Sequence, residues 1–241
     1  MRYGAVFLDM GFTLVKFHPS FEGIYGQACR EGGFEVADGD MVEAIQAVWR
    51  GLVDQNLLRP VEVSEAAALE WQRTSSRRVL SRVGVPGREV KRFMSRIDEL
   101  FMDPASYRVY EEVPEVLSGL RSAGLRLGIV SNWDWHLPRL CRELGVDRHL
   151  HFIVTSARVG ASKPEPRIFQ EAFRLAGVSP ERTLHVGDSY RADVLGAREA
   201  GADAVLLDRG DKPPLEAVEL DGGDDVRVIR DLRGLLPLAL E

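Results

Sequence analysis

The apolar run Ala5-Val6-Phe7-Leu8 constrains the fold more than any other feature of the chain, because it ends abruptly on a carboxylate, Asp9. A glycine, Gly11, follows two residues later, so the run is a short strand that stops and turns. Continuous apolar strands are typical of parallel sheets that are buried on both faces. Open α/β sheets bind their ligands at the carboxyl ends of such strands. Asp9 is therefore a candidate functional acid, although an aspartate that only caps the next turn would give the same pattern.

Four further aliphatic runs repeat this strand pattern, and a segment with helical spacing follows each of the first three. This alternation is the signature of βαβ units on a parallel sheet. The sequence therefore predicts an α/β fold with a doubly wound, Rossmann-like parallel sheet. The predicted strands cover residues 125–130, 152–155, 183–186 and 204–207, with an edge strand at 226–229, and the predicted helices cover residues 113–123, 166–176 and 192–200.

Residues 16–104 interrupt the pattern, because no convincing strand occurs there while apolar residues recur at helical spacing. The segment leaves the sheet after the first strand and returns before the helix at 113–123, so both crossings lie at the mouth of the presumed site. We expect an α/β core domain of residues 1–15 and 105–241 with an inserted helical domain of residues 16–104. The predicted helices of the insertion cover residues 21–32, 40–52, 64–83, with Ser64 as N-cap, and 86–101.

Composition argues against several classes of function. The 241 residues carry a net charge of −6, whereas nucleic-acid-binding proteins normally show a basic stripe. No run approaches the roughly 20 apolar residues that span a bilayer, and Asp9 breaks the first run too early for a signal peptide. The two cysteines, Cys29 and Cys141, lack the spacing of a zinc or redox motif. We therefore expect a cytoplasmic protein that binds neither nucleic acid nor membranes.

Polar side chains follow two other segments of the predicted core. Ser131 and Asn132 come directly after the strand at 125–130, where a hydroxyl and an amide can donate hydrogen bonds to an oxyanion. Lys163 precedes Pro164, which restricts its backbone. A lysine fixed in this way can neutralise a phosphate or a charged nucleophile, although an exposed lysine before a helix is the ordinary alternative.

Two more acids, Asp188 and Asp193, follow the strand at 183–186. Two carboxylates one turn apart at a strand end repel each other unless a cation or a lysine lies between them. A helix N-cap at Asp188 or Ser189 with an acid in the first turn would be the ordinary interpretation. All four motifs together, in order along the predicted core, favour one shared site instead.

Taken in chain order, four motifs resemble those of the haloacid dehalogenase-like (HAD) hydrolase superfamily, and the likeness covers nearly the whole chain. They are Asp9, Ser131 with Asn132, Lys163, and Asp188 with Asp193. The resemblance implies a Rossmann-like core with strand order 3-2-1-4-5 and a helical (C1-type) cap inserted between the first and second motifs. It implies that Asp9 attacks phosphorus and forms an aspartyl-phosphate. The implied substrate is a small phosphorylated metabolite that the cap encloses.

The resemblance also gives the other motif residues roles in catalysis. Thr13 and Ser131 would hold phosphate oxygens or the nucleophile. Asn132 belongs to the same motif as Ser131, and Lys163 would offset negative charge. These four residues and Asp9 form the implied catalytic set.

The implied cofactor is Mg²⁺, which prefers oxygen ligands. Its ligands would be the Asp9 carboxylate, the backbone carbonyl of Gly11 and Asp188, with Asp193 just outside them. Because Mg²⁺ bonds are short, Asp9 and Asp188 more than about 10 Å apart could not share one ion.

Gly11 departs from the phosphatase pattern, because superfamily phosphatases carry there a second aspartate that protonates the leaving group and then activates water. Such acid–base help is worth roughly 10²- to 10⁴-fold in rate. The 2-haloacid dehalogenases of the superfamily lack this aspartate and work without Mg²⁺, but their last motif is less acidic than Asp188 with Asp193. The sequence therefore favours a phosphatase, with a 2-haloacid dehalogenase as the alternative. A third interpretation is a catalytically weakened protein that only binds a phosphorylated ligand or a protein partner.

Overall fold

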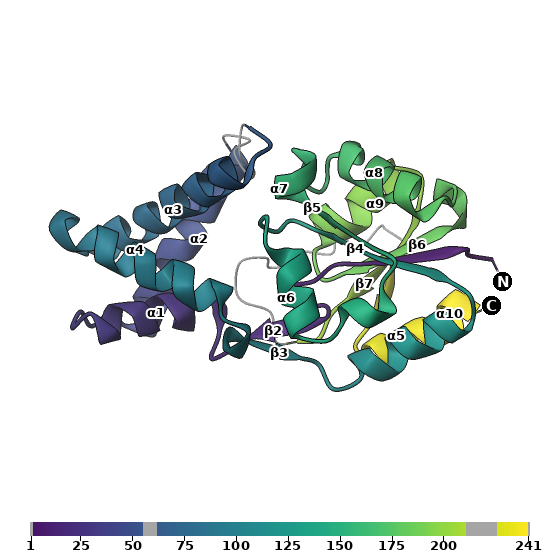
Figure 1. Ribbon diagram of the computed structural model, residues 1–241, viewed down its shortest axis with the longest axis horizontal. Coiled ribbons are helices and arrows are strands. Elements are labelled where there is room, and N and C mark those ends of the chain that lie inside the picture. The colour runs from purple at the N-terminus through teal and green to yellow at the C-terminus, as the bar shows by residue number, and fades with distance from the viewer. Residues whose placement is uncertain (1, 55–61, 211–225, 241) are drawn as a thin grey trace.

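A six-stranded parallel sheet forms the centre of the computed structural model, which describes residues 2–54, 62–210 and 226–240 (Figure 1). Its strands are β1 (Ala5–Leu8), β4 (Arg126–Ser131), β5 (Phe152–Thr155), β6 (Thr183–Gly187), β7 (Asp203–Leu207) and β8 (Arg227–Ile229). They are arranged in the order β5-β4-β1-β6-β7-β8, and every neighbouring pair is parallel. The predicted order of the five core strands and the predicted edge strand are thereby confirmed, with β1 in the interior of the sheet.

Helices cover both faces of the sheet, as a doubly wound fold requires (Figure 1). Successive side chains of a strand point to opposite faces, so Val6 and Leu8 of β1 pack in one apolar cluster while Ala5 and Phe7 pack in the other. All four side chains are fully buried, which explains why the run holds no polar residue before Asp9. The first cluster includes α5 (Val113–Ser122), α6 (Leu137–Glu143) and α10 (Leu235–Leu240), the second includes α8 (Pro166–Ala176) and α9 (Gly196–Glu199), and the short α7 (Ser156–Val159) follows β5.

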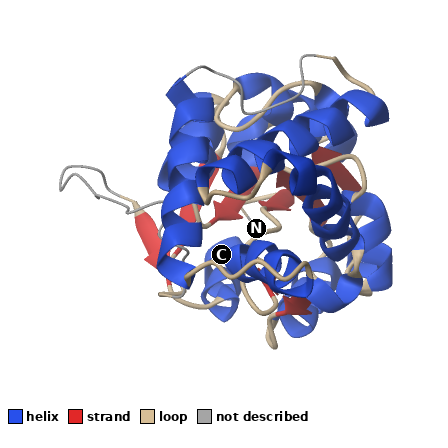
Figure 2. Ribbon diagram, turned by 90° about the vertical axis from the view of Figure 1, so that its left-hand side faces the viewer, coloured by secondary structure: helices blue, strands red, loops and turns tan. Residues whose placement is uncertain are grey.

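Four helices form the inserted segment, which we call the four-helix insertion. They are α1 (Phe21–Glu31), α2 (Asp38–Asp54), α3 (Glu65–Arg82) and α4 (Gly87–Met102). The hydroxyl of Ser64 accepts from the Ala67 amide at 3.1 Å, as an N-cap does. The insertion lies on the side of the sheet toward which β1 leads, and Figure 2 shows it in front of the strands. In the described parts of the chain, no helix is both long and apolar enough to cross a lipid bilayer.

An antiparallel ribbon joins the insertion to the core. It consists of β2 (Val15–Phe17) and β3 (Tyr107–Val109), which pair through three residues each. The expectation that residues 16–104 hold no strand is therefore wrong for Lys16 and Phe17. Three-residue strands are too short to show an alternating pattern, because they span little more than one period.

The helix predicted over residues 192–200 begins earlier in the structure, and its first turns are not α-helical. The chain forms a π-helical turn over Tyr190–Leu195 and continues as α9. Ser189 caps this turn, since its hydroxyl accepts from the Ala192 amide at 3.1 Å. Wide π turns are often found at functional sites, and this one carries Asp193.

Candidate active site

Three carboxylates from separate segments meet at the carboxyl edge of the sheet. Asp9 follows β1, Asp188 follows the adjacent strand β6, and Asp193 lies in the π-helical turn beyond it. Each of the three offers a carboxylate oxygen within 4.8 Å of those of the other two. The acids are thus close enough to share one cation.

Lys163 provides a positive charge between two of these acids. Its Nζ donates to Asp9 Oδ1 and to Asp193 Oδ1, each 2.5 Å away, and its side chain is only 2% exposed. Burial alone would lower the pKa of Lys163, but the carboxylates of Asp193 and Asp9 raise it well above its usual range. Lys163 therefore stays protonated and offsets part of the repulsion between the acids.

The two carboxylates that bind Lys163 differ in acidity. Burial alone would raise the pKa of Asp193, but Lys163 and His185 together lower it below its usual range. Burial raises the pKa of Asp9, and the opposing charge of Lys163 only limits the rise. Asp193 is thus the more stabilised anion, while Asp9 keeps the greater basicity that suits a nucleophile.

The position of Asp193 is fixed by its own surroundings. Its Oδ2 accepts from the Ser189 amide at 3.0 Å, and its Oδ1 accepts from His185 Nε2 at 2.8 Å. A Cβ at Gly187 would lie 2.1 Å from the carboxyl carbon of Asp193, so only glycine leaves room for this approach. Asp193 can therefore hold Lys163 without moving.

Ser131 and Asn132 both lie at the site, but they face different groups. The side chain of Ser131 is buried and hydrogen-bonds to Asp9. The amide of Asn132 donates from Nδ2 to the Lys163 carbonyl at 2.9 Å, and its Oδ1 accepts from the Lys163 amide at 2.7 Å. One N–H of the Asn132 amide thus fixes the backbone of Lys163, and its predicted hydrogen bond to an oxyanion stays a prediction.

The turn after β1 carries Gly11 and Thr13, two and four residues beyond Asp9. Thr13 is fully buried, and its Oγ1 has no hydrogen-bond partner in the described structure. A buried hydroxyl without a partner is costly, and an oxygen of a bound anion is a group that would satisfy it. A Cβ at Gly11 would lie 3.3 Å from Cζ3 of Trp133, so this indole borders the space of the missing second aspartate.

The acidic cluster fits a hard divalent cation. Its three donors are all carboxylate oxygens, which Mg²⁺ prefers, and a single ammonium group opposes their charge. Asp9 and Asp193 are buried, whereas Asp188 is only partly buried. A cation would therefore enter from the side of Asp188.

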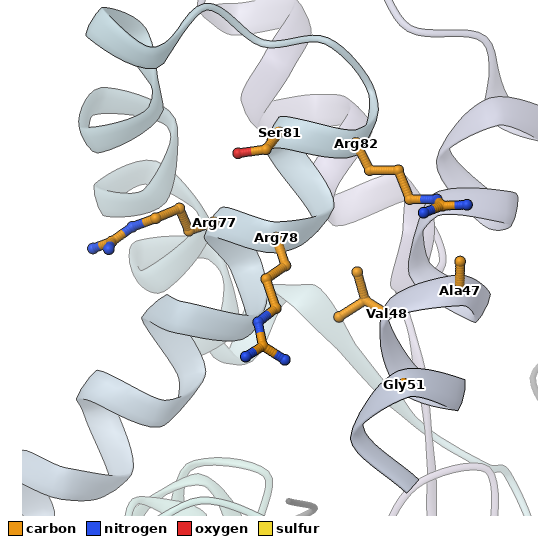
Figure 3. Close-up of a pocket in the computed structure, with 7 residues that line it drawn as sticks. All are labelled: Ala47, Val48, Gly51, Arg77, Arg78, Ser81 and Arg82. Atoms are coloured by element: carbon orange, nitrogen blue, oxygen red, sulfur yellow. The ribbon is translucent and has the colours of Figure 1, made fainter. Parts of the chain in front are cut away.

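A groove lies within the four-helix insertion. This groove of about 430 Å³ runs between α2 and α3, and in Figure 3 the side chain of Arg82 extends toward Ala47. The residues that line it are Ala47, Val48, Gly51, Arg77, Arg78, Ser81 and Arg82. None of them belongs to the strand ends, so the groove is separate from the acidic site.

Two residues at the site were not predicted from the sequence. His185 is fully buried and bonds Asp193, and a polar residue inside an apolar strand was an available signal. Arg209 donates to the Thr13 carbonyl, 196 positions away, at 2.9 Å. No local pattern in the sequence indicates a contact over that separation.

Comparison with known proteins agrees with this geometry. The sequence model of the haloacid dehalogenase-like hydrolases matches residues 3–201. The haloacid dehalogenase-like hydrolase domain-containing protein 3 of Mus musculus is 30% identical over 230 residues, which cover 95% of this chain and 90% of that protein. A glyceraldehyde 3-phosphate phosphatase of Methanothermobacter thermautotrophicus is 38% identical over 139 residues, or 54% of this chain and 58% of that protein.

Solved structures share the fold at lower sequence identity. The HAD-hydrolase YfnB of Bacillus subtilis, described as bound to magnesium, has a TM-score of 0.72 and 21% identity over 99% of both chains. A 2-haloacid dehalogenase of Pseudomonas syringae has a TM-score of 0.64 and 24% identity over 99% of this chain and 98% of that chain. The fold is thus found in proteins with more than one chemistry, so the reaction of this chain has to be inferred from its site residues.

Proposed function

The chain belongs to the haloacid dehalogenase-like hydrolases, and from this premise we propose that it is a Mg²⁺-dependent phosphatase of small phosphorylated metabolites. One observation carries the proposal: the carboxylates of Asp9, Asp188 and Asp193 lie within 4.8 Å of one another, and the ammonium of Lys163 bonds Asp9 and Asp193. The name of the Methanothermobacter relative is consistent with a small phosphorylated substrate.

Asp9 is the proposed nucleophile. An oxygen of its carboxylate attacks phosphorus, the bond from phosphorus to the ester oxygen breaks, and the leaving oxygen takes a proton from water because Gly11 offers no acid. Water then attacks the aspartyl-phosphate, which releases inorganic phosphate and restores the Asp9 carboxylate. The hydrogen bonds from Ser131 and Lys163 orient the Asp9 carboxylate for the first step.

The surrounding residues bind and orient the phosphoryl group. The unpaired hydroxyl of Thr13 would donate to a phosphate oxygen, while Lys163 offsets negative charge. Asp9, Asp188 and the carbonyl of Gly11 are the proposed ligands of Mg²⁺, which when bound neutralises and orients the phosphate. Asp193 lies beside them and keeps Lys163 in position.

The acidic cluster favours a phosphatase over a dehalogenase. A dehalogenase that uses no metal would gain nothing from Asp188 next to Asp9 and Asp193, yet the repulsion among the three would remain. Gly11 favours the dehalogenase, since halide leaves carbon without a proton. We weigh the acids more heavily because they act on charge at the reacting centre itself.

The four-helix insertion is the proposed cap that encloses the substrate, and residues 16–104 are its proposed extent. Two contacts support its approach to the core. Val63, just before α3, approaches Gly160 so closely that a Cβ there would lie 2.5 Å from Val63 Cγ2, and Glu65 Oε1 lies 3.5 Å from His136 Nε2.

A paired screen tests the proposed function. The protein is offered a panel of small phosphate monoesters and a panel of 2-haloacids, each with Mg²⁺ and with EDTA, and released phosphate and halide are measured. We expect phosphate release that requires Mg²⁺ and is abolished in Asp9→Asn, because an amide is nearly isosteric but is a poor nucleophile. Halide release that persists in EDTA, with no phosphate release, would assign the dehalogenase chemistry instead.

A further inference from the structure

Arg209 makes buried contacts with three residues on two segments at the edge of the site. It lies two residues beyond β7, and its side chain is 8% exposed. Its Nη2 donates to the Thr13 carbonyl at 2.9 Å and to Glu112 Oε1 at 2.5 Å. Its guanidinium carbon lies 3.6 Å from the centre of the Tyr110 ring, within the range of a cation–π contact.

These contacts fall on both crossings between the core and the four-helix insertion. Thr13 stands two residues before β2, while Tyr110 and Glu112 stand just after β3. The Tyr110 amide donates to the Leu14 carbonyl at 3.1 Å, so the pairing of the ribbon continues to this point. Arg209 therefore links the two chain segments at the core end of the ribbon.

The turn that Arg209 contacts is under backbone strain. Phe12 has a φ of 53°, in the left-handed region that non-glycine residues rarely adopt. Such a conformation persists only where neighbouring contacts determine it. Within the turn, Phe12 N donates to the Val15 carbonyl at 2.7 Å, and the bond from Arg209 holds the intervening carbonyl of Thr13.

The ion pair with Glu112 does not by itself explain a buried arginine. Buried ion pairs contribute little net stability, because desolvation of both charges offsets their attraction. The bond to Thr13 gives Arg209 a role that an apolar residue of similar volume could not fill. Resting on the function proposed above, we propose that Arg209 is a positioning residue: it fixes the turn whose Gly11 carbonyl and Thr13 hydroxyl face the phosphoryl group.

A set of four variants tests this role. Arg209→Met removes both hydrogen bonds but leaves Glu112 as an unpaired buried charge, so loss of stability alone could slow it. The double variant Arg209→Met/Glu112→Gln removes that charge as well, and Glu112→Gln alone completes the cycle. Arg230→Met is the matched control, because Arg230 is exposed and forms its ion pair with Asp208 instead.

Hydrolysis of p-nitrophenyl phosphate with saturating Mg²⁺ gives the first readout. We expect the double variant to regain stability relative to Arg209→Met while its kcat stays about 10- to 100-fold below wild type, with a smaller change in KM. Arg230→Met should match wild type. Wild-type kcat in the double variant would overturn the proposal, since Arg209 would then only neutralise Glu112. If the double variant does not fold, Arg209→Lys, which keeps the charge but loses the planar fork, must show the same kcat deficit.

Backbone hydrogen exchange without substrate separates this proposal from the proposed function. We expect faster exchange over residues 10–17 in the double variant and unchanged exchange in Arg230→Met. A wild-type protein that hydrolyses no phosphate ester would contradict the phosphatase, yet faster exchange would still support the contact of Arg209 with the turn. Unchanged exchange over residues 10–17 would overturn it.

Discussion

At the scale of single residues, the charge balance of the site depends on Lys163, whose ammonium bonds both Asp9 and Asp193. Lys163→Met leaves these two buried carboxylates without that cation. We expect it to lower the free energy of unfolding by about 3–5 kcal/mol near neutral pH, measured by urea unfolding in EDTA. Lys91→Met, at an exposed position of α4, is the control and should change it by less than about 0.5 kcal/mol.

The same variant should respond to pH with a defined sign. Burial raises the pKa of Asp9, and without the opposing charge of Lys163 this pKa lies still further above its value in the unfolded chain. The folded variant then binds protons more tightly than the unfolded chain, so its stability rises as the pH falls. The deficit relative to wild type should therefore shrink between about pH 7 and pH 5. A deficit that is constant over this range would contradict the account of buried charge.

Gly11 is the position where the missing acid can be restored. Its backbone lies outside the left-handed region, and an added Cβ would meet only the Trp133 side chain at 3.3 Å. We expect Gly11→Asp to accelerate hydrolysis of the aspartyl-phosphate by about 10²-fold or more, because water then has a general base. Gly11→Ala adds the Cβ without the carboxyl and should give no gain. Equal rates in both variants would mean that another group already transfers the proton.

Some site residues could be predicted from the sequence because of their positions at the ends of strands. Asp9, Asp188 and Ser131 directly follow or end apolar strands, and parallel strands bring their carboxyl ends to one edge. The orientation of Asn132 could not be predicted, because it depends on the backbone of Lys163, 31 positions away. Arg209 was missed for the same reason.

At the scale of elements, the end of β6 and the π-helical turn beyond it form one tightly packed unit around Asp193. A Cβ at Gly187 would lie 2.1 Å from the carboxyl carbon of Asp193, which is closer than two carbon atoms in contact can approach, so either the buried strand or Asp193 would have to shift. Gly187→Ala should therefore lower the free energy of unfolding by about 1–3 kcal/mol and reduce the rate of phosphate release. Gly39→Ala, in α2 with nothing within 4 Å, is the control and should be neutral or slightly stabilising. A wild-type rate in Gly187→Ala would show that Asp193 need not be fixed.

The strands and helices that the sequence predicted well were those with long apolar patterns. α8 begins at Pro166 and precedes Gly177, and both boundaries carry sequence signals. The ribbon β2–β3 has no such signal, since each strand is three residues long and pairs with residues 90 to 94 positions away. The π-helical turn depends on Ser189 and Asp193 bonding each other, which a helical pattern does not distinguish from an ordinary first turn.

At the scale of the whole molecule, the insertion meets the core near α3 through Val63 and Gly160. If the insertion encloses the substrate, weakening this contact should raise KM for a metabolite-sized substrate by a few-fold, since the apolar contact is worth roughly 1 kcal/mol. Val63→Asp is the test, and Val228→Asp is the control, because it changes a similarly exposed valine on the edge strand. An unchanged KM in Val63→Asp would argue against closure through this contact.

The overall architecture was predictable because short apolar runs alternate with segments of helical spacing, which is typical of a parallel α/β sheet. The strand order itself came from the resemblance to known hydrolases, since the apolar pattern gives the strands but not their neighbours. The site was predictable as a set of residues, whereas the bonds that fix it depend on contacts between distant segments.

The most direct test of the central claim is to trap the phosphoryl group on Asp9. Turnover of p-nitrophenyl phosphate with Mg²⁺ is quenched rapidly with acid, and the protein is analysed by intact mass and peptide mapping. Because Gly11 supplies no general base, breakdown of the intermediate should be slow, so we expect a burst and one added phosphoryl group on the peptide that contains Asp9. Asp9→Asn should carry none. Sustained phosphate release with no phosphoryl group on that peptide, or full activity in Asp9→Asn, would contradict covalent catalysis by Asp9.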